Sequence, residues 1–190
     1  MKIKFWLKND KYVAGITMRD EAEAENGNMA LHTGADAKAA LENRRKLASF
    51  LGRGIEDFVC AYQTHSANYH KATAADRGRG SVAMENAIPD TDALYTFEPG
   101  LLLCCFTADC VPLIFYSERT GLIGVIHSGW GGTVREIVPK VLEHLKNKEG
   151  ISISDMRVFI GPAISQEKFE VDEDVRDRFA ALGYADEFIC

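Results

Sequence analysis

The sequence lacks the features that mark several classes of protein. It has 22 Lys and Arg against 28 Asp and Glu, a net charge of −6, and no basic cluster, which argues against nucleic acid or an anionic membrane as main partner. No apolar run approaches the roughly 18 residues of a membrane helix, and charges enter the first ten residues too early for a signal peptide. Five unevenly spaced cysteines do not resemble a disulfide scaffold. We therefore expect a cytoplasmic protein with reduced thiols and a small-molecule or protein partner.

What is present favours one continuous domain. The chain has 190 residues, 46% of them hydrophobic, and its 16 Gly and 5 Pro are scattered rather than pooled into a linker. Apolar runs bounded by polar stretches predict strands at residues 11–18, 57–62, 101–106, 111–116, 122–126 and 157–160. Helices are expected at residues 36–51, with Asp36 as N-cap, at residues 134–145, where Pro139 kinks the helix or delays its start, and near the chain end. The small and polar residues at 71–89 indicate a long loop and a candidate lid. The alternation of predicted strands and helices along the chain predicts a mixed α/β or α+β fold.

Arg44 interrupts the apolar stripe of the helix predicted at residues 36–51. A buried cation is costly without a partner. Either the stripe opens on a site that holds an anion or polar ligand, or the guanidinium reaches outward to solvent.

Three residues that could bind a metal stand at the ends of separate apolar strands: His65, Cys110 and His127. One Cys and two His would supply a catalytic zinc site with an open fourth position. The alternatives are hydrogen-bonded histidines and a buried thiol. Asp109, between two apolar runs, must find a partner if it is buried. The glycine-rich turn at residues 128–133 either binds an anion at a helix N-terminus or serves only as a tight turn.

Four segments, in order along the chain, closely resemble one family. They are Gln63-Thr64-His65, Thr107-Ala108-Asp109-Cys110-Val111-Pro112, His127-Ser128-Gly129-Trp130-Gly131-Gly132-Thr133 and Phe159-Ile160-Gly161-Pro162-Ala163-Ile164, with Phe169-Glu170-Val171 after the last. On these segments the sequence is similar to the YfiH/YlmD-type proteins, long labelled laccase-like multicopper polyphenol oxidoreductases and now regarded as zinc-dependent purine nucleoside phosphorylases with adenosine deaminase activity.

The resemblance implies an α+β fold of two related halves with mixed sheets in four layers, α/β/β/α. It implies that His65, Cys110 and His127 bind zinc, with copper as the other candidate metal, and that Asn28 and Arg44 contact the nucleoside or phosphate. Family chains usually have a basic residue in place of Gly131, a charge that Arg135 or Arg44 could replace here. They also continue past the point matching Cys190, so we expect residues 1–190 to form a single domain that lacks its C-terminal segment.

The expected activity is phosphorolysis of adenosine, inosine or 5′-methylthioadenosine, with deamination of adenosine as a second reaction. Catalytic roles fall to Cys110, His127 and Asp109, the last as proton carrier or as a group that orients a ligand. Three alternatives remain open: a hydrolase or deamidase with Cys110 as nucleophile and His127 as base, a copper-dependent polyphenol oxidase, and a structural zinc protein that binds partners.

Overall fold

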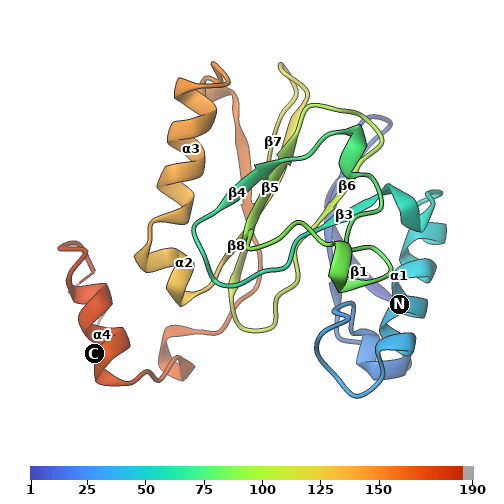
Figure 1. Cartoon of the computed structure of the whole chain (residues 1–190), viewed down its shortest axis with the longest axis horizontal. Helices are drawn as coiled ribbons and strands as arrows, with labels where there is room; N and C mark the ends of the chain where they lie inside the picture. The colour runs from blue at the N-terminus through green and yellow to red at the C-terminus, as the bar shows by residue number, and fades with distance from the viewer. Residues whose placement is uncertain (186–190) are drawn as a thin grey trace.

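The computed structural model describes residues 1–185, and its largest element is a five-stranded mixed sheet (Figure 1). The strand order is β4 (Tyr69–Lys71), β5 (Ala93–Thr96), β8 (Leu122–Ser128), β7 (Val111–Ser117) and β9 (Arg157–Ile160). Strands β4 and β5 run parallel, and the other neighbours run antiparallel. The apolar runs expected at residues 111–116 and 122–126 form β7 and β8 in this sheet, whereas the run at residues 101–106 belongs to a separate small sheet.

Two small sheets lie on the other side of the molecule. Strands β1 (Lys2–Lys8) and β2 (Val13–Met18) form an antiparallel hairpin, while β3 (Phe58–Cys60) and β6 (Leu102–Cys104) form a parallel pair. Helix α1 (Ala37–Phe50) lies outside these strands, and α3 (Ile137–Asn147) lies outside the five-stranded sheet (Figure 1). The predicted α+β class is therefore confirmed, with layers in the order α/β/β/α. The relation between two halves stays a prediction.

Three clusters of buried side chains hold these layers together. One joins the five-stranded sheet to α3, through residues such as Phe115, Ile126 and Val141. A second lies between the sheets, and a third joins α1 to the β3–β6 pair. In each cluster the apolar face of a strand or helix is buried, and burial of that apolar area is the main stabilising term of the fold.

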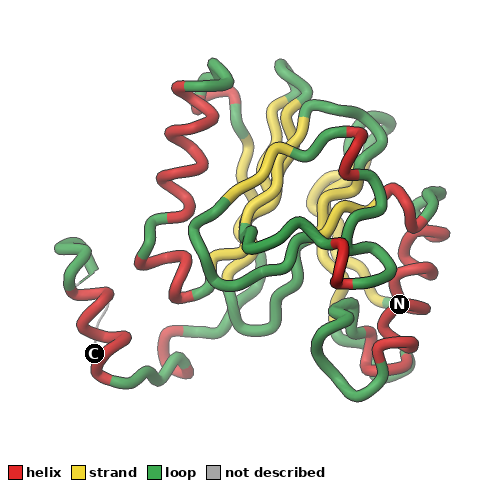
Figure 2. The backbone as a smooth tube through the Cα atoms, in the orientation of Figure 1, coloured by secondary structure: helices red, strands yellow, loops and turns green. Residues whose placement is uncertain are grey.

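Helix boundaries follow local capping chemistry. The Asp36 carboxylate accepts hydrogen bonds from the Lys38 and Ala39 N–H groups, so α1 begins where the sequence predicts. The helix expected at residues 134–145 starts later, as α3, which confirms the expected delay of its start. A separate short helix, α2 (Trp130–Val134), precedes it, and Glu136 between the two adopts a left-handed conformation with φ of 58°. Pro139 then lies in the first turn of α3, where its missing N–H costs nothing. The remaining helices are α4 (Glu173–Ala180) and short 3₁₀ turns at Ala24–Gly27, Ile55–Asp57, Ala74–Asp76, Met84–Asn86, Ile153–Asp155 and Gln166–Lys168 (Figure 2).

Residues 71–89 differ from the expected open lid. Their backbone is tied to β3, since Gly78 donates to the Phe58 carbonyl, Cys60 to the Arg79 carbonyl and Ile88 to the Cys60 carbonyl. The side chain of Ile88 is buried. The segment thus packs as an irregular extension of the small parallel sheet. Of the five cysteines, Cys190 lies outside the described residues. In the described part of the chain, no helix has the length and apolar character needed to span a membrane.

Candidate metal centre

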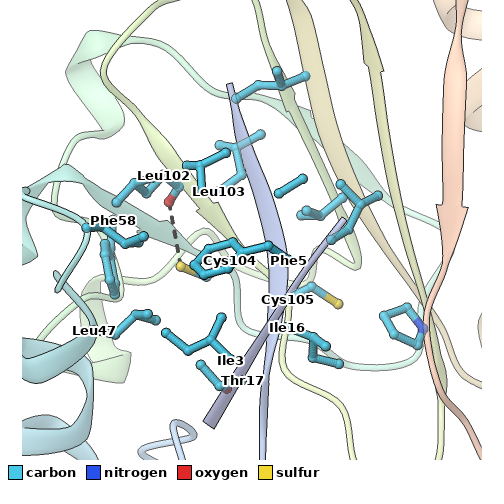
Figure 3. A pocket seen from close by; sticks show the side chains of 18 of the residues that line it. Ile3, Phe5, Ile16, Thr17, Leu47, Phe58, Leu102, Leu103, Cys104 and Cys105 are labelled. Carbon is cyan, nitrogen blue, oxygen red and sulfur yellow. Dashed lines mark hydrogen bonds between the residues drawn. The ribbon is translucent and has the colours of Figure 1, made fainter. Parts of the chain in front are cut away.

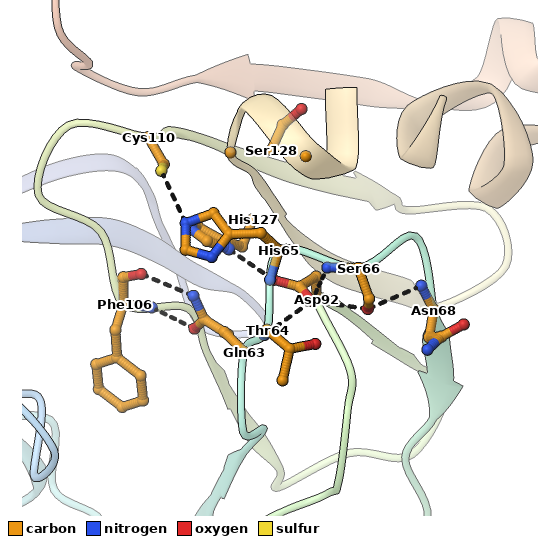
Figure 4. A network of polar contacts seen from close by, with 12 residues as sticks. Gln63, Thr64, His65, Ser66, Asn68, Asp92, Phe106, Cys110, His127 and Ser128 are labelled. Atoms are coloured by element: carbon orange, nitrogen blue, oxygen red, sulfur yellow. Dashed lines mark hydrogen bonds and ion pairs between the residues drawn. The ribbon is translucent and has the colours of Figure 1, made fainter. Parts of the chain in front are cut away.

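The side chains of His65, Cys110 and His127 meet at one edge of the five-stranded sheet (Figure 4). His127 lies near the end of β8, and Cys110 directly precedes β7, whose first residues pair with the last residues of β8. His65 arrives on the loop that follows β3. Antiparallel pairing therefore brings Cys110 and His127 together although 17 residues separate them in the sequence.

The three side chains form a compact set of donors. One ligand atom from each lies within 4.8 Å of the other two, and Cys110 Sγ is 3.6 Å from His65 Nε2. The two imidazole rings have centroids 4.9 Å apart. His127 is buried, Cys110 is partly buried and His65 is exposed, so the set opens to solvent on the His65 side.

A buried carboxylate that the sequence analysis missed organises this site. Asp92 is 3% exposed and directly precedes β5. It accepts hydrogen bonds from His127 Nδ1 at 2.7 Å and from the backbone N–H groups of Thr64, His65 and Ser66 (Figure 4). Three amide donors fix the turn that carries His65, and the bond to His127 sets that imidazole's orientation. An acid in front of an apolar run is the sequence signal that could have identified Asp92, as it did Asp109.

The conformation of His65 is unusual and is held from both sides. Its φ is 59°, in the left-handed region that favours glycine. Asp92 accepts the His65 N–H, while Arg135 Nη1 donates to the His65 carbonyl at 3.0 Å and to the Gly131 carbonyl at 2.9 Å. The surrounding hydrogen bonds thus stabilise a backbone conformation that is costly in isolation.

Two glycines of the turn leave space that the site needs. A Cβ at Gly129 would lie 2.3 Å from His65 Cδ2 and 3.0 Å from Cys110 Sγ. A Cβ at Gly131 would lie 2.8 Å from the His65 carbonyl oxygen and 2.9 Å from Arg135 Nη1. A side chain at either position would collide with the site, so glycine is needed there for more than the tight turn. Arg135 places its guanidinium beside Gly131.

The charges around the site act on its ionisable groups. Burial lowers the pKa of His65, with a further contribution from His127, so the ring favours the neutral form that a metal requires. Burial would raise the pKa of Asp92, but the hydrogen bonds from His127 and Ser66 outweigh it and hold that pKa low. Burial raises the pKa of the Cys110 thiol, and the negative charges of Asp109 and Asp92 raise it further.

The remaining predicted site residues are not ligands of this cluster. Asp109 lies beside Cys110 with its side chain exposed, and the carboxylate that contacts His127 is Asp92. The histidine hydrogen-bonded to Cys110 is His65, not His127, which changes the base in the predicted nucleophile pair. The catalytic role of Asp109 stays a prediction.

Arg44 does not reach outward to solvent. Its side chain is buried, with Nε donating to the Met29 carbonyl, Nη1 to the Gly80 and Ser81 carbonyls, and the guanidinium 4.5 Å from the centre of the Phe106 ring. The Phe106 backbone in turn pairs with the Gln63 side chain, two residues before His65.

Asn28 uses its side chain within its own loop. Its amide group bonds to the backbone of Ala30 and Thr33. Asn28 and Arg44 both line a groove of about 940 Å³ between the β1–β2 hairpin and the larger sheet, whose lining includes Phe106 and Pro112 but not the three clustered donors (Figure 3). The groove therefore approaches the cluster without including it.

Residues 14–189 match the family described as multi-copper polyphenol oxidoreductase laccase. The chain belongs to this family. Among its relatives, the chain is 40% identical over 169 residues to purine nucleoside phosphorylase YlmD of Geobacillus stearothermophilus, covering 87% of this chain and 62% of that protein. It is 32% identical over 182 residues to adenosine deaminase RL5 from an unknown prokaryotic organism, covering 94% of this chain and 69% of that protein.

Solved structures of this laccase family agree with the fold. The YfiH protein of Bacillus licheniformis superposes with a TM-score of 0.86 at 35% identity, covering 92% of this chain and 67% of that chain. YlmD from Geobacillus stearothermophilus gives a TM-score of 0.83 at 39% identity, and the match covers 89% of this chain and 64% of that chain. The chain thus spans less than two thirds of the length of the YlmD relative.

Proposed function

We propose that this chain carries the metal centre of a zinc-dependent purine nucleoside phosphorylase, which converts adenosine, inosine or 5′-methylthioadenosine to the base and ribose 1-phosphate. Deamination of adenosine is the proposed second activity. The observation that carries the proposal is the cluster of one thiol and two imidazoles that is open at His65. Relatives named purine nucleoside phosphorylase and adenosine deaminase support the reaction classes.

The donor set suits zinc. Catalytic zinc sites use three protein ligands and leave one position for water or substrate, and Cys with His is an accepted combination. Three donor atoms within 4.8 Å of one another, with His65 exposed to solvent, fit that description. A zinc ion held there would supply a Lewis acid that lowers the pKa of a coordinated water molecule toward about 7.

Asp92 is the proposed positioning residue of this centre. A carboxylate can only accept, so His127 Nδ1 donates its proton to Asp92 and leaves Nε2 as the ligand atom. The same carboxylate holds the backbone of His65 through its N–H group. One acid therefore orients both histidines.

Two arginines are the proposed contacts for phosphate. Arg135 places its guanidinium beside the His65 backbone, where position 131 has no side chain. Arg44 has an Nη2 group with no hydrogen-bond partner among residues 1–185 and lines the groove.

Asn28, on the same groove, is the proposed nucleoside contact. Asp109, exposed beside Cys110, is the proposed proton carrier.

A copper-dependent polyphenol oxidase is the second candidate, favoured by the description of the matched family. One thiolate and two imidazoles also suit copper. The cysteine hydrolase is less well supported, because a nucleophilic cysteine needs a lowered pKa and burial raises that of Cys110.

The test combines metal analysis with product assays on the full chain. Inosine is supplied with and without phosphate, adenosine is supplied without phosphate, and hypoxanthine and inosine are quantified as products. We expect phosphate-dependent release of hypoxanthine and deamination of adenosine, both lost together with zinc in Cys110→Ala. Activity that survives metal removal and is abolished by thiol alkylation would instead support the hydrolase. Copper loading with phenol oxidation and no base release would favour the oxidase.

A further inference from the structure

A pair of sulfur atoms lies away from the metal centre. Cys60 on β3 and Cys104 on β6 are direct partners in the register of the parallel pair. Partners on adjacent strands point to the same face, and both side chains belong to the cluster that packs against α1. Cys105 faces the opposite way, into the cluster between the sheets. Adjacent strands lie about 4.8 Å apart, within the range of Cα separations that disulfides span.

A buried positive charge lies beside this pair. Arg44 is 1% exposed, and its Nη1 is 4.0 Å from Cys60 Sγ. No carboxylate among residues 1–185 pairs with Arg44, and its Nη2 has no hydrogen-bond partner there. Its Nε and Nη1 bond to neutral backbone carbonyls, so its positive charge favours the thiolate form of the neighbouring Cys60.

The two thiols share their ionisation unequally. The Cys104 thiol donates to the Leu102 carbonyl at 3.6 Å. The neighbouring Cys104 side chain lowers the pKa of Cys60, burial opposes that shift, and the charge of Arg44 adds to it. The pKa of Cys104 is raised well above its ordinary value by the neighbouring Cys60 side chain and by burial. Cys60 is therefore the sulfur favoured as thiolate.

The groove gives one of these sulfurs a route to small molecules. Cys104 lines the groove of about 940 Å³, where it lies among Leu47, Phe58 and Leu102 (Figure 3). Cys60 lies behind it and is fully buried. A water-sized oxidant that enters the groove meets Cys104 first, while Cys60 is shielded from direct attack.

We propose that Cys60 and Cys104 are a reversible oxidation site that forms a disulfide with hydrogen peroxide as oxidant. Cys104 passes its proton to the Cys60 thiolate, the Cys104 sulfur attacks one peroxide oxygen, and the O–O bond breaks. The departing hydroxide takes the proton back from Cys60, which leaves a sulfenic acid on Cys104, one water and the Cys60 thiolate. The Cys60 thiolate then attacks the Cys104 sulfur, the S–S bond forms, and hydroxide leaves and takes a proton to give the second water. Two electrons pass from the sulfurs to the peroxide. The site is independent of the metal centre.

The experiment uses the reduced, zinc-loaded full chain treated with hydrogen peroxide. Remaining thiols are alkylated, the chain is digested, and linked peptides are sequenced by mass spectrometry before and after dithiothreitol. We expect a Cys60–Cys104 link that dithiothreitol removes. Zinc content measured on the same sample shows whether Cys110 has reacted.

Matched variants make the assignment specific. Cys104→Ser removes the link, whereas Cys105→Ser, one residue along and facing the other way, retains it. If Cys104→Ser does not fold, the sequenced link in the wild-type chain decides the question. A link from Cys60 to Cys105, or peroxide products without any link, would overturn the proposal. Neither result decides the test of nucleoside phosphorolysis, because the proposed metal ligands His65, Cys110 and His127 are separate from this cysteine pair. Arg44 is shared by the two proposals and is unchanged in these variants.

Discussion

Asp92 shows how a single residue can organise a site without touching a ligand. It accepts hydrogen bonds from three consecutive backbone N–H groups and from His127. Asp109, the acid that the sequence analysis selected, is exposed. Both acids stand in front of apolar strands, so sequence position alone does not distinguish them. What distinguishes them is burial, which requires Asp92 to be fully hydrogen-bonded.

Replacement of Asp92 by Asn tests its positioning role. The neutral amide keeps the shape but loses the charge, and its NH₂ group opposes backbone donors. We expect the affinity for zinc to fall roughly 10- to 100-fold and the free energy of unfolding to fall by about 1–3 kcal/mol. Competition with a chromogenic chelator measures the first effect, and urea denaturation measures the second.

Asp109→Asn is the matched control for that experiment. Its side chain is exposed, so we expect its zinc affinity and stability to equal those of the wild type. A larger loss of zinc affinity in Asp109→Asn than in Asp92→Asn would assign the orienting role to Asp109 instead.

At the scale of elements, local rules explain most of the agreement between sequence and structure. The Asp36 cap, the strand at Arg157–Ile160 and the apolar runs of β7 and β8 all lie where residue patterns predict them. The departures are also local. The left-handed backbone of Glu136 delays the start of the helix predicted at residues 134–145 to Ile137. The charges within Lys2–Lys8 conceal a strand that only its pairing with β2 reveals.

The segment at residues 71–89 keeps its fixed shape partly through Asp76. This carboxylate accepts hydrogen bonds from the Thr73 N–H, from Arg79 Nη1 and from His70 Nε2. Burial would raise the pKa of Asp76, but these hydrogen bonds outweigh it and lower the pKa below the ordinary 3.8. Because the folded pKa is the lower one, the stabilisation is complete above pH 3.8 and is lost as the pH falls through the folded value.

Asp76→Asn is therefore expected to cost about 0.5–2 kcal/mol of unfolding free energy near neutral pH. The difference from the wild type should shrink as the pH falls from 3.8 through the lower pKa of the folded state, where the wild-type carboxyl also becomes protonated. Urea denaturation of the metal-free proteins, near neutral pH and again at the acidic pH, measures this difference in unfolding free energy. Asp155→Asn, which removes a partner of the exposed Arg119, is the control and should change stability by less than about 0.5 kcal/mol. A difference that grows on acidification would contradict the assignment.

At the scale of the whole molecule, the metal centre joins parts of the chain that belong to different sheets. His65 follows β3 of the small parallel sheet, while Cys110 and His127 belong to the five-stranded sheet. A metal ion bound by all three would therefore link the layers and stabilise the folded state, in which alone the three donors meet.

Zinc is accordingly expected to raise the melting temperature of the whole chain. At a free concentration near 1,000 times Kd, the stabilisation is about 4 kcal/mol, which for a chain of this length corresponds to roughly 10 °C. Thermal scans with zinc and with excess chelator measure the shift. Cys110→Ser should lose most of it, and an equal shift in that variant would place the zinc site elsewhere.

The sequence by itself determined the residue types and the local elements: the caps, the apolar strands, the glycine turn and the His and Cys candidates. These depend on interactions within a few residues, such as capping hydrogen bonds and periodic burial. The tertiary structure alone decided that Asp92 holds His65 and His127, that Arg44 is buried and that Cys60 faces Cys104. The contacts of Asp92 and of the cysteine pair join residues 27 to 44 positions apart, as with His65 and Asp92 or Cys60 and Cys104. They depend on strand order and register, which no local pattern encodes.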